Sequence, residues 1–460
     1  MTAADLAGVI RRREASPVEA VDAALAKIAR FQNYNAFITV SAEEARSAAL
    51  ASMANFSGGE SLPPLFGVPF TVKDLTLTAG VRTTFGSRAF SETVPTEDSV
   101  AVGRLRDAGA ILVGKTTTPE FGHKAFTEAP LFGRTLNPWN SNVTCGGSSG
   151  GAAVAALLGL GSLALGTDGG GSIRIPASCC GVVGLKATLG AIPNIHVSDM
   201  FASSSYVGPM ARTVREISFA LNILRGVDTR DPFGQLSLPT RKPRPVDGLR
   251  IAWLPNSLGR GVHHEVAEHT HRAVALLQTQ GALVEEITLD FAELEPAYMT
   301  ITDSALAYRF GPLLKSKRDQ FDPSFVRSIE NGLDHSAVDV QAANAERTIM
   351  FRKLQNIFEK CDLLLSPTLA APPVNIGLNT HDPISLAGQA PAPIRQAWYP
   401  FTFPFNLSGH PALSMPCGFT SEGLPIGLQI AGPWHGENQI LATAAALEEE
   451  IGVVRFEPTS

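Results

Sequence analysis

The sequence predicts an α/β fold, namely a single large α/β/α domain whose mixed, mostly buried central sheet is covered by helices. Apolar segments typical of buried strands alternate along the chain with amphipathic or small-residue helical segments. With 460 residues, of which 44% are hydrophobic and 17% charged, the chain can enclose a large core. No repeat or low-complexity linker divides it. We therefore expect one domain over residues 1–460.

The first part of the chain contains a helix with clear end signals and a buried strand. Residues 16–31, SPVEAVDAALAKIARF, have an amphipathic pattern. Ser16 is a suitable N-cap, Pro17 suits the first helical position, and a glutamate two residues further on completes a capping box. Residues 64–74, PLFGVPFTVKD, predict a buried strand that ends at Lys73.

The alternation continues through the middle of the chain. Residues 99–116 predict a helix, a turn at Gly109 and a strand. Residues 150–160 predict a helix of small residues that packs closely against a neighbour. Residues 248–255 predict another strand, followed by a helix through Ala275.

The last third combines helices, two strands and a long irregular region. Residues 290–360 predict a mostly helical, more variable part. Strands are expected at the start of residues 362–377 and within 424–433, and a helix closes the chain. Residues 370–400 are rich in proline and glycine, and we expect a functional loop there rather than a domain hinge.

Composition excludes several functional classes. The net charge of −6 gives no electrostatic footprint for nucleic acid, so we expect no nucleic-acid partner. The N-terminus lacks an apolar segment followed by a cleavage site, and the longest apolar stretch is too short to span a membrane. Five scattered cysteines without paired spacing indicate reduced thiols. We therefore expect a soluble, cytoplasmic protein without membrane contact.

Two patterns suggest ligands but fail on physical grounds. GAILVGKT, residues 109–116, matches the phosphate-loop pattern, yet its four middle residues are those of a strand and not of a turn-forming loop. HHEVAEHTH, residues 263–271, holds several histidines, but His264 and His269 are five residues apart and build no single ligand face. We expect no nucleotide, no metal and no other cofactor.

GGSSGG, residues 146–151, contains a candidate nucleophile. Its first five residues fit G-x-S-x-G, the nucleophile elbow of α/β-hydrolases, which would make Ser148 the nucleophile of an esterase. An elbow requires a strand immediately before it and a later Asp and His. The preceding residues predict a loop, and no local pattern singles out His410 or His435. The esterase hypothesis stays open as an alternative.

GTDGGGSIRIP, residues 166–176, places three glycines directly before Ser172. Glycine costs backbone entropy, so a triple run needs a reason. The flanking segments are apolar and suggest burial, where backbone N–H groups need partners. Bare N–H groups lined up beside a serine can bind an oxyanion. The segment is therefore a candidate oxyanion site next to Ser172.

Three separated segments together resemble the amidase signature family. They are GVPFTVKD at 67–74, GGSSGG at 146–151 and GTDGGGSIRIPASCCGVVGLKAT at 166–188, in this order and at this spacing. Weaker matches such as GPMARTV, DLLLSPT and FNLSGHPALSMPCG extend the resemblance over nearly the whole chain. The resemblance implies a catalytic core at about residues 60–235 and 360–455.

The resemblance assigns a role to each matching residue. Ser172 matches the nucleophile, Ser148 the bridging serine after a cis peptide, and Lys73 the general base. A neutral lysine requires burial to lower its pKa by several units. Further matches are the glycine backbone of an oxyanion hole and three supporting polar residues: Gly169, Gly170 and Gly171; Ser149, Asp168 and Arg174.

These roles imply a serine amidohydrolase that cleaves C–N bonds of amides, and of carbamates within the family's range, through an acyl-enzyme. The family's tRNA-dependent amidotransferase A subunit usually has Thr, Gln and Pro where this chain has Gly169, Ile175 and Ala187. These departures favour a free-standing hydrolase, and Gly169 leaves extra room beside the reacting carbonyl. An amidotransferase A-like component that acts with partners stays the alternative.

Aromatic residues are candidate walls of an apolar pocket that suits aryl or alkyl amides, anilides and related carbamates: Phe126, Phe132, Phe201, Tyr206, Trp398 and Tyr399. No basic residue is expected to receive a substrate carboxylate, because Arg174 is expected to pair with Asp168. We expect a small-molecule amide or carbamate as the partner of this site, and a monomer or homodimer as the assembly.

Overall fold

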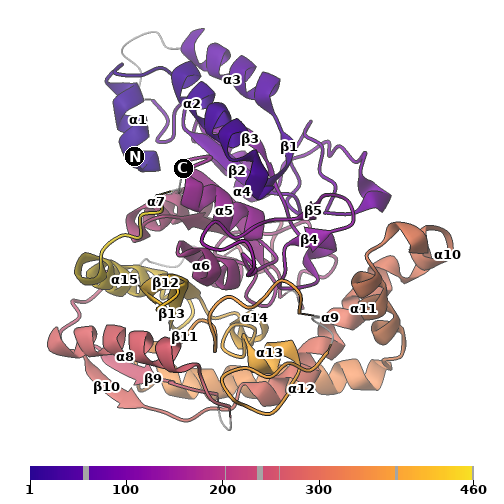
Figure 1. Ribbon diagram of the computed structural model, residues 1–460, viewed down its shortest axis with the longest axis vertical. Helices are drawn as coiled ribbons and strands as arrows, with labels where there is room; N and C mark the ends of the chain where they lie inside the picture. Colours follow the sequence, from indigo (N-terminus) through magenta and orange to yellow (C-terminus); the bar gives the residue numbers. More distant parts are fainter. Residues whose placement is uncertain (55–61, 203, 236–241, 258–259, 379–381, 458–460) are drawn as a thin grey trace.

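The computed structural model describes residues 1–54, 62–202, 204–235, 242–257, 260–378 and 382–457. Within these ranges one mixed sheet of eleven strands runs through the molecule, with helices packed along it (Figure 1). A separate two-stranded ribbon accompanies the sheet. This architecture confirms the predicted α/β fold with a mixed central sheet.

The strands follow in chain order: β1 Phe37–Val40, β2 Pro69–Lys73, β3 Ile111–Thr116, β4 Glu128–Ala129, β5 Gly133–Arg134, β6 Leu163–Asp168, β7 Val183–Lys186, β8 Tyr206–Ala211, β9 Arg250–Trp253, β10 Leu283–Glu286, β11 Leu363–Pro367, β12 Ala412–Phe419 and β13 Pro425–Ala431. Their spatial order in the large sheet is β1-β3-β2-β6-β8-β7-β12-β13-β11-β9-β10. β2 pairs in parallel with β3 and β6. β9 pairs in parallel with β10 and β11, and the strands between these two groups pair antiparallel.

The helices follow in chain order: α1 Ala3–Arg11, α2 Pro17–Arg30, α3 Ala42–Ala54, α4 Val100–Asp107, α5 Gly150–Leu158, α6 Arg174–Cys180, α7 Val214–Leu224, α8 His264–Thr279, α9 Glu295–Phe310, α10 Leu314–Lys317, α11 Pro323–Leu333, α12 Ala337–Phe358, α13 Ile394–Ala397, α14 Pro404–Ser408 and α15 Glu437–Ile451. None of the helices in the described ranges is long and apolar enough to cross a membrane.

The sheet is covered on both faces, as the side chains of β3 show, because successive residues of this strand belong to different hydrophobic cores. On β3, Ile111 and Val113 belong to a core shared with α2, α3 and α5. Leu112, between them, belongs to a core shared with α4, α7, α8 and α15. Successive side chains of a strand point to opposite faces, so the two cores lie on opposite sides of the sheet. A sheet buried on both faces explains the nearly continuous apolar strand sequences.

Several predicted elements have the expected bounds. α2 begins after Ser16, whose side chain accepts the N–H of Glu19 in a complete capping box. β2 is buried throughout and ends at Lys73. GAILVGKT lies largely in the buried strand β3, which leaves no turn that could cradle a phosphate. Local sequence signals are therefore sufficient to predict these elements.

The helical segment α9 to α12 lies beside the sheet, at the lower right of Figure 1. α9 packs against α11 and α12, and the phenol group of its Tyr298 bonds to the carbonyl oxygen of Gly169, directly after β6. A segment far away in the sequence therefore closes over the glycine loop.

Candidate active site

Lys73 lies at the end of β2, and its side chain is fully buried. Its Nζ lies 2.7 Å from Ser148 Oγ, and 2.9 Å from both Ser149 Oγ and Thr167 Oγ1. Thr167 belongs to β6, the direct neighbour of β2, so parallel pairing places its hydroxyl beside the amine. The sheet and the serine segment together surround the amine with hydroxyl groups.

The electrostatics of this site favour an uncharged amine. Burial lowers the pKa of Lys73 well below its ordinary value, and the negative charge of Asp168 opposes this only in part. Among the residues that the structure describes, no carboxylate forms an ion pair with Lys73, so only neutral hydrogen-bond partners replace the lost hydration.

The two serines follow a cis peptide bond between Gly147 and Ser148. The N–H of Ser149 donates to the carbonyl oxygen of Ser172 at 3.1 Å, which joins this turn to the glycine loop. A Cβ placed on Gly122 would lie 3.0 Å from Ser148 Oγ, so a hydroxyl fits here only because residue 122 has no side chain. The structure thus brings Lys73, Ser148, Ser149 and the Ser172 backbone into one site.

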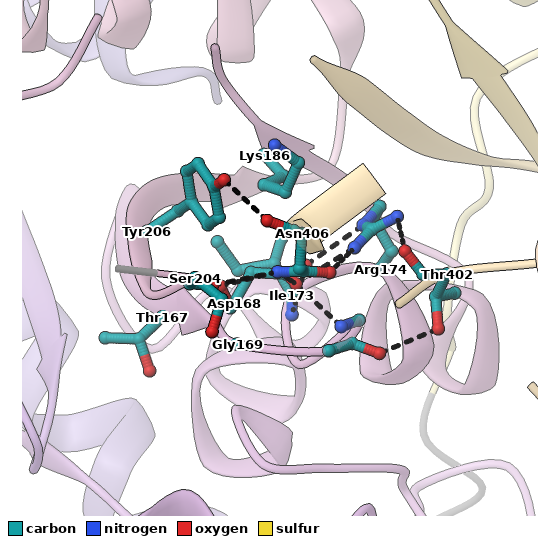
Figure 2. A network of polar contacts seen from close by, with 12 residues as sticks. Thr167, Asp168, Gly169, Ile173, Arg174, Lys186, Ser204, Tyr206, Thr402 and Asn406 are labelled. Atoms are coloured by element: carbon teal, nitrogen blue, oxygen red, sulfur yellow. Dashed lines mark hydrogen bonds and ion pairs between the residues drawn. The ribbon is translucent and has the colours of Figure 1, made fainter. Parts of the chain in front are cut away.

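The loop after β6 is organised by Asp168 (Figure 2). Its carboxylate accepts the N–H groups of Gly171 at 2.7 Å and Ile173 at 3.1 Å. Arg174 donates to both carboxylate oxygens at 3.0 Å, and both side chains are fully buried. Although burial opposes ionisation, the charge and hydrogen bonds of Arg174 hold the pKa of Asp168 below its usual value. Asp168 and Arg174 thus form the predicted pair.

The remaining donors of Arg174 bind residues from the C-terminal part of the chain. They reach the carbonyl oxygen of Thr402, the side-chain oxygen of Gln429 and that of Asn406 at 2.7–2.8 Å. All five guanidinium donors are used, which is what a buried arginine requires. Asn406 also donates to the carboxylate and the carbonyl oxygen of Asp168, at 2.8 and 2.9 Å. Sequence reasoning missed these partners, because their segments carry no local signal that names them.

The amide groups of the loop have different surroundings. Gly171 donates its N–H to Asp168 and is therefore engaged within the protein, which removes it from the predicted oxyanion donors in this structure. Within the described ranges, the N–H groups of Gly169, Gly170 and Ser172 have no hydrogen-bond acceptor. Ser172 is only half-buried. Three amide donors thus remain available next to a partly accessible hydroxyl.

The three glycines are required to different degrees. A Cβ on Gly170 would lie 2.3 Å from Tyr298 Oη, and one on Gly171 would lie 2.4 Å from Thr402 Oγ1. Gly171 also has a φ of +119°, which disfavours residues with a side chain. A Cβ on Gly169 would meet nothing within 4 Å. Gly170 and Gly171 are therefore fixed by packing, whereas residue 169 faces open space.

A cleft of about 860 Å³ opens at this loop. Thr167 and Gly169 line it on the side of the site, and Gly122 brings it next to Ser148. Tyr298 and other residues of α9 form a further wall. This volume suits a drug-sized organic molecule.

None of the six predicted aromatic walls lines this cleft. Phe126 and Trp398 pack against each other in a buried core that also contains Tyr399, with the first two ring centroids 5.9 Å apart. Phe201 is 74% exposed, and Phe132 is half-buried. Tyr206 donates its hydroxyl to the carbonyl oxygen of Asn406 and lies under Lys186. Residue type alone does not distinguish core aromatics from those at the cleft, such as Phe85, Phe121 and Tyr298.

The family model for amidases matches residues 19–441. The chain belongs to the amidase signature family. An acylamidase of Rhodococcus erythropolis is 36% identical over 97% of this chain and 95% of its own length. The A subunit of a glutamyl-tRNA(Gln) amidotransferase from Moorella thermoacetica is also 36% identical, over 100% of this chain and 98% of its own.

Solved structures share this fold. A bacterial aryl acylamidase superposes with a TM-score of 0.91 at 29% identity, covering 98% of this chain and 96% of its own. The amidotransferase A subunit of Thermotoga maritima has a TM-score of 0.76 at 28% identity, covering 94% and 91%. As a member of this family, with an acylamidase relative, the chain is a hydrolase that acts on amide C–N bonds.

The features that suggested other chemistry have structural explanations. α5 begins at Gly150, and Ser148 is preceded by a loop with isolated bridges at Leu136 and Thr144, not by the strand of a nucleophile elbow. His410 is buried among the rings of Phe351, Phe358 and Trp434. Within the described ranges, no group of three or more His, Cys, Asp or Glu side chains is arranged to hold a metal ion.

Proposed function

We propose that the family's amide hydrolysis is carried out here by Ser172 as nucleophile, Ser148 as proton relay and Lys73 as general base. The observation that carries this proposal is the 2.7 Å contact between the buried Lys73 Nζ and Ser148 Oγ. A hydroxyl nucleophile needs a base that is neutral at working pH, and burial supplies such a base from a lysine.

The contacts of Lys73 fit a neutral amine that takes a proton from Ser148. The hydroxyl hydrogen of Ser149 is donated to the carbonyl oxygen of Thr167 at 3.0 Å, so towards Lys73 this hydroxyl accepts. A neutral amine has two N–H donors and one lone pair. In the proposed relay the two donors serve Ser149 and Thr167, and the lone pair takes the hydroxyl hydrogen of Ser148, whose Oγ lies 2.7 Å from Nζ.

The proposed reaction proceeds through an acyl-enzyme. Lys73 takes the Ser148 proton while Ser148 takes the Ser172 proton, and Ser172 Oγ bonds to the amide carbon. The carbonyl oxygen becomes an oxyanion next to the free N–H groups of Gly169, Gly170 and Ser172. The proton returns through Ser148 to the departing nitrogen as the C–N bond breaks. Water then attacks the acyl-enzyme by the same relay and releases the acid.

We further propose small acyl or aryl amides, and related carbamates, as substrates. The named relatives include an acylamidase and an aryl acylamidase. The open position at Gly169 admits a substituent beside the reacting carbonyl.

All five cysteines are free, which agrees with the expected cytoplasmic location. A monomer or homodimer without an obligate partner stays part of this proposal.

The purified chain, tested alone on an acyl 4-nitroanilide, tests the proposal. We expect release of 4-nitroaniline without metal, tRNA or a second protein. Ser172→Ala should abolish it, and Ser148→Ala should leave a small residual rate. Hydrolysis that requires added amidotransferase partners would support the amidotransferase alternative. Loss of acylation in Ser148→Ala with retention in Ser172→Ala would support an esterase that uses Ser148.

A further inference from the structure

Arg395 is an arginine of the cleft whose donors are open, in contrast to those of Arg174. It lies on α13, lines the cleft together with Gly169, and is half-buried. Within the ranges that the structure describes, the guanidinium group of Arg395 forms no hydrogen bond and no ion pair. Its guanidinium carbon lies 5.7 Å from the ring centroid of Tyr298. A guanidinium keeps its charge and carries five donors, so Arg395 can bind an anionic group that enters the cleft.

The carboxyl groups that face Arg395 do not occupy it. Glu295 and Asp303, both on α9, act on its charge from a distance, and the phenols of Tyr298 and Tyr399 complete its surroundings. Burial raises the pKa of Glu295 and raises that of Asp303 to about 6, which leaves Asp303 largely ionised at pH 7, yet among the described residues neither carboxyl group lies within ion-pair distance of Arg395. The guanidinium thus stays open towards the cleft.

Arg395 is also close to the reacting centre. The hydroxyl of Tyr298 donates to the carbonyl oxygen of Gly169 at 3.1 Å. One phenol ring therefore separates the guanidinium from the loop that carries Ser172. A substrate bound with its carbonyl at this loop can extend along the ring and reach Arg395 with its other end.

We propose that Arg395 determines specificity by binding a carboxylate of the substrate, so that the cleft prefers amides that carry an anionic group. This inference rests on the proposed hydrolysis and names its substrate class more closely. The planar fork of a guanidinium matches a carboxylate bidentately. Arg309, which also lines the cleft without an ion pair among the described residues, adds positive charge. The inference replaces the sequence-based expectation that no basic residue receives a carboxylate.

Matched chromogenic anilides test this preference. N-acetyl-4-nitroaniline is compared with N-acetyl-3-carboxy-4-nitroaniline, and N-butyryl-4-nitroaniline with N-succinyl-4-nitroaniline, which places the carboxylate on the acyl side. For the wild type we expect a higher kcat/KM for the carboxylated member of at least one pair. In Arg395→Gln the carboxylate-to-neutral ratio should fall about tenfold or more, and in Arg395→Lys it should fall less.

Arg327→Gln is the matched control. Arg327 is exposed on α11 and does not line the cleft, so this variant removes the same charge elsewhere. Its carboxylate-to-neutral ratio should equal that of the wild type. The proposal is overturned if the wild type prefers neither carboxylated anilide, or if Arg395→Gln lowers kcat/KM equally for both members of a pair. The latter result would mean that Arg395 only positions Tyr298.

A binding measurement separates this inference from the proposed hydrolysis. In the Ser172→Ala background, titration calorimetry compares 3-carboxy-4-nitroaniline with 4-nitroaniline, and the succinyl with the butyryl anilide, with and without Arg395→Gln. We expect the carboxylated amine or the succinyl anilide to lose about tenfold in affinity when Arg395 is replaced. Selective binding without any turnover by the wild type would refute the hydrolysis alone. Turnover with equal affinities for charged and neutral ligands would refute the role of Arg395 alone.

Discussion

Two lysines on neighbouring strands, Lys73 on β2 and Lys115 on β3, are both fully buried and yet occupy very different sites. Lys115 Nζ donates to the carbonyl oxygen of Thr76 and to the hydroxyls of Thr78 and Thr83, 2.5–2.9 Å away. Burial lowers the pKa of Lys115 to about 8, against the opposing charge of Asp74. Burial also lowers the pKa of Lys73 well below its ordinary value.

The difference teaches that burial alone does not make a lysine a base. A carbonyl oxygen can only accept a hydrogen bond, so the Lys115 site favours an ammonium group. The hydroxyl of Ser148 can donate as well as accept, and it lies next to the cleft. A neutral amine is useful only where such a hydroxyl connects it to the substrate.

The largest effect should separate the two lysines. We expect Lys73→Met to lower kcat for anilide hydrolysis by about 10⁴-fold, because the base is lost. Lys115→Met should keep kcat within about tenfold but lower the free energy of unfolding by about 1–3 kcal/mol, because buried acceptors lose their donor. Steady-state kinetics and urea unfolding measure both. Comparable kcat losses in the two variants would refute the comparison.

The next test removes one hydroxyl group that hydrogen-bonds to each lysine. Ser148→Ala should lower kcat by about 10²–10⁴-fold, the range of a lost proton transfer. Thr83→Val removes a hydroxyl that accepts a hydrogen bond from Lys115. This variant should lower the free energy of unfolding by about 1–3 kcal/mol with little change in kcat. Steady-state kinetics and urea unfolding again separate the two effects. A wild-type rate in Ser148→Ala would exclude the relay.

The two lysines should also give two separate pH profiles. In the proposed mechanism only the neutral form of Lys73 is active, so kcat/KM should fall about tenfold per pH unit below its pKa. For Lys115, the folded pKa of about 8 lies below the ordinary 10.5, so the unfolded state binds more protons between these values. Stability should therefore rise with pH there, by up to about 1.4 kcal/mol per unit.

The control for this profile is Lys115→Met. Subtracting its unfolding free energies from those of the wild type across pH isolates the Lys115 contribution, which should level off below pH 8. A difference that falls as pH rises above 8 would contradict the expected sign.

The smallest effect should come from the threonine hydroxyls. Thr167→Val leaves one N–H of Lys73 without an acceptor, and we expect kcat to fall by about tenfold, the equivalent of one hydrogen bond. Thr78→Val does the same to Lys115 and should change only the unfolding midpoint. If Thr78→Val lowered kcat as much, the Lys115 site would belong to the catalytic apparatus.

The parts of the site that the sequence predicts are local. The end of β2 at Lys73, the capping of α2 and the glycine loop are each encoded within a few residues. The pairing of Asp168 with Arg174 is predictable for the same reason, since the two are six residues apart.

The parts that the sequence does not predict depend on distant segments. Tyr298 and Thr402 contact the glycine loop from positions more than a hundred residues away in the sequence. The periodicity of apolar residues in the sequence does not predict such contacts. The expected aromatic walls rest on residue type, which does not tell the core around Trp398 from the cleft. Arg395 lies in the proline-rich stretch expected to be functional, but its open donors become visible only in three dimensions.

Gly169 differs from the two glycines that follow it, because its position has room for a side-chain atom. Its two successors are fixed by Tyr298 and Thr402, whereas a Cβ on residue 169 would have no protein atom within 4 Å. In the proposed mechanism, a substitution at residue 169 changes the space beside the reacting carbonyl and leaves the two following glycines in place.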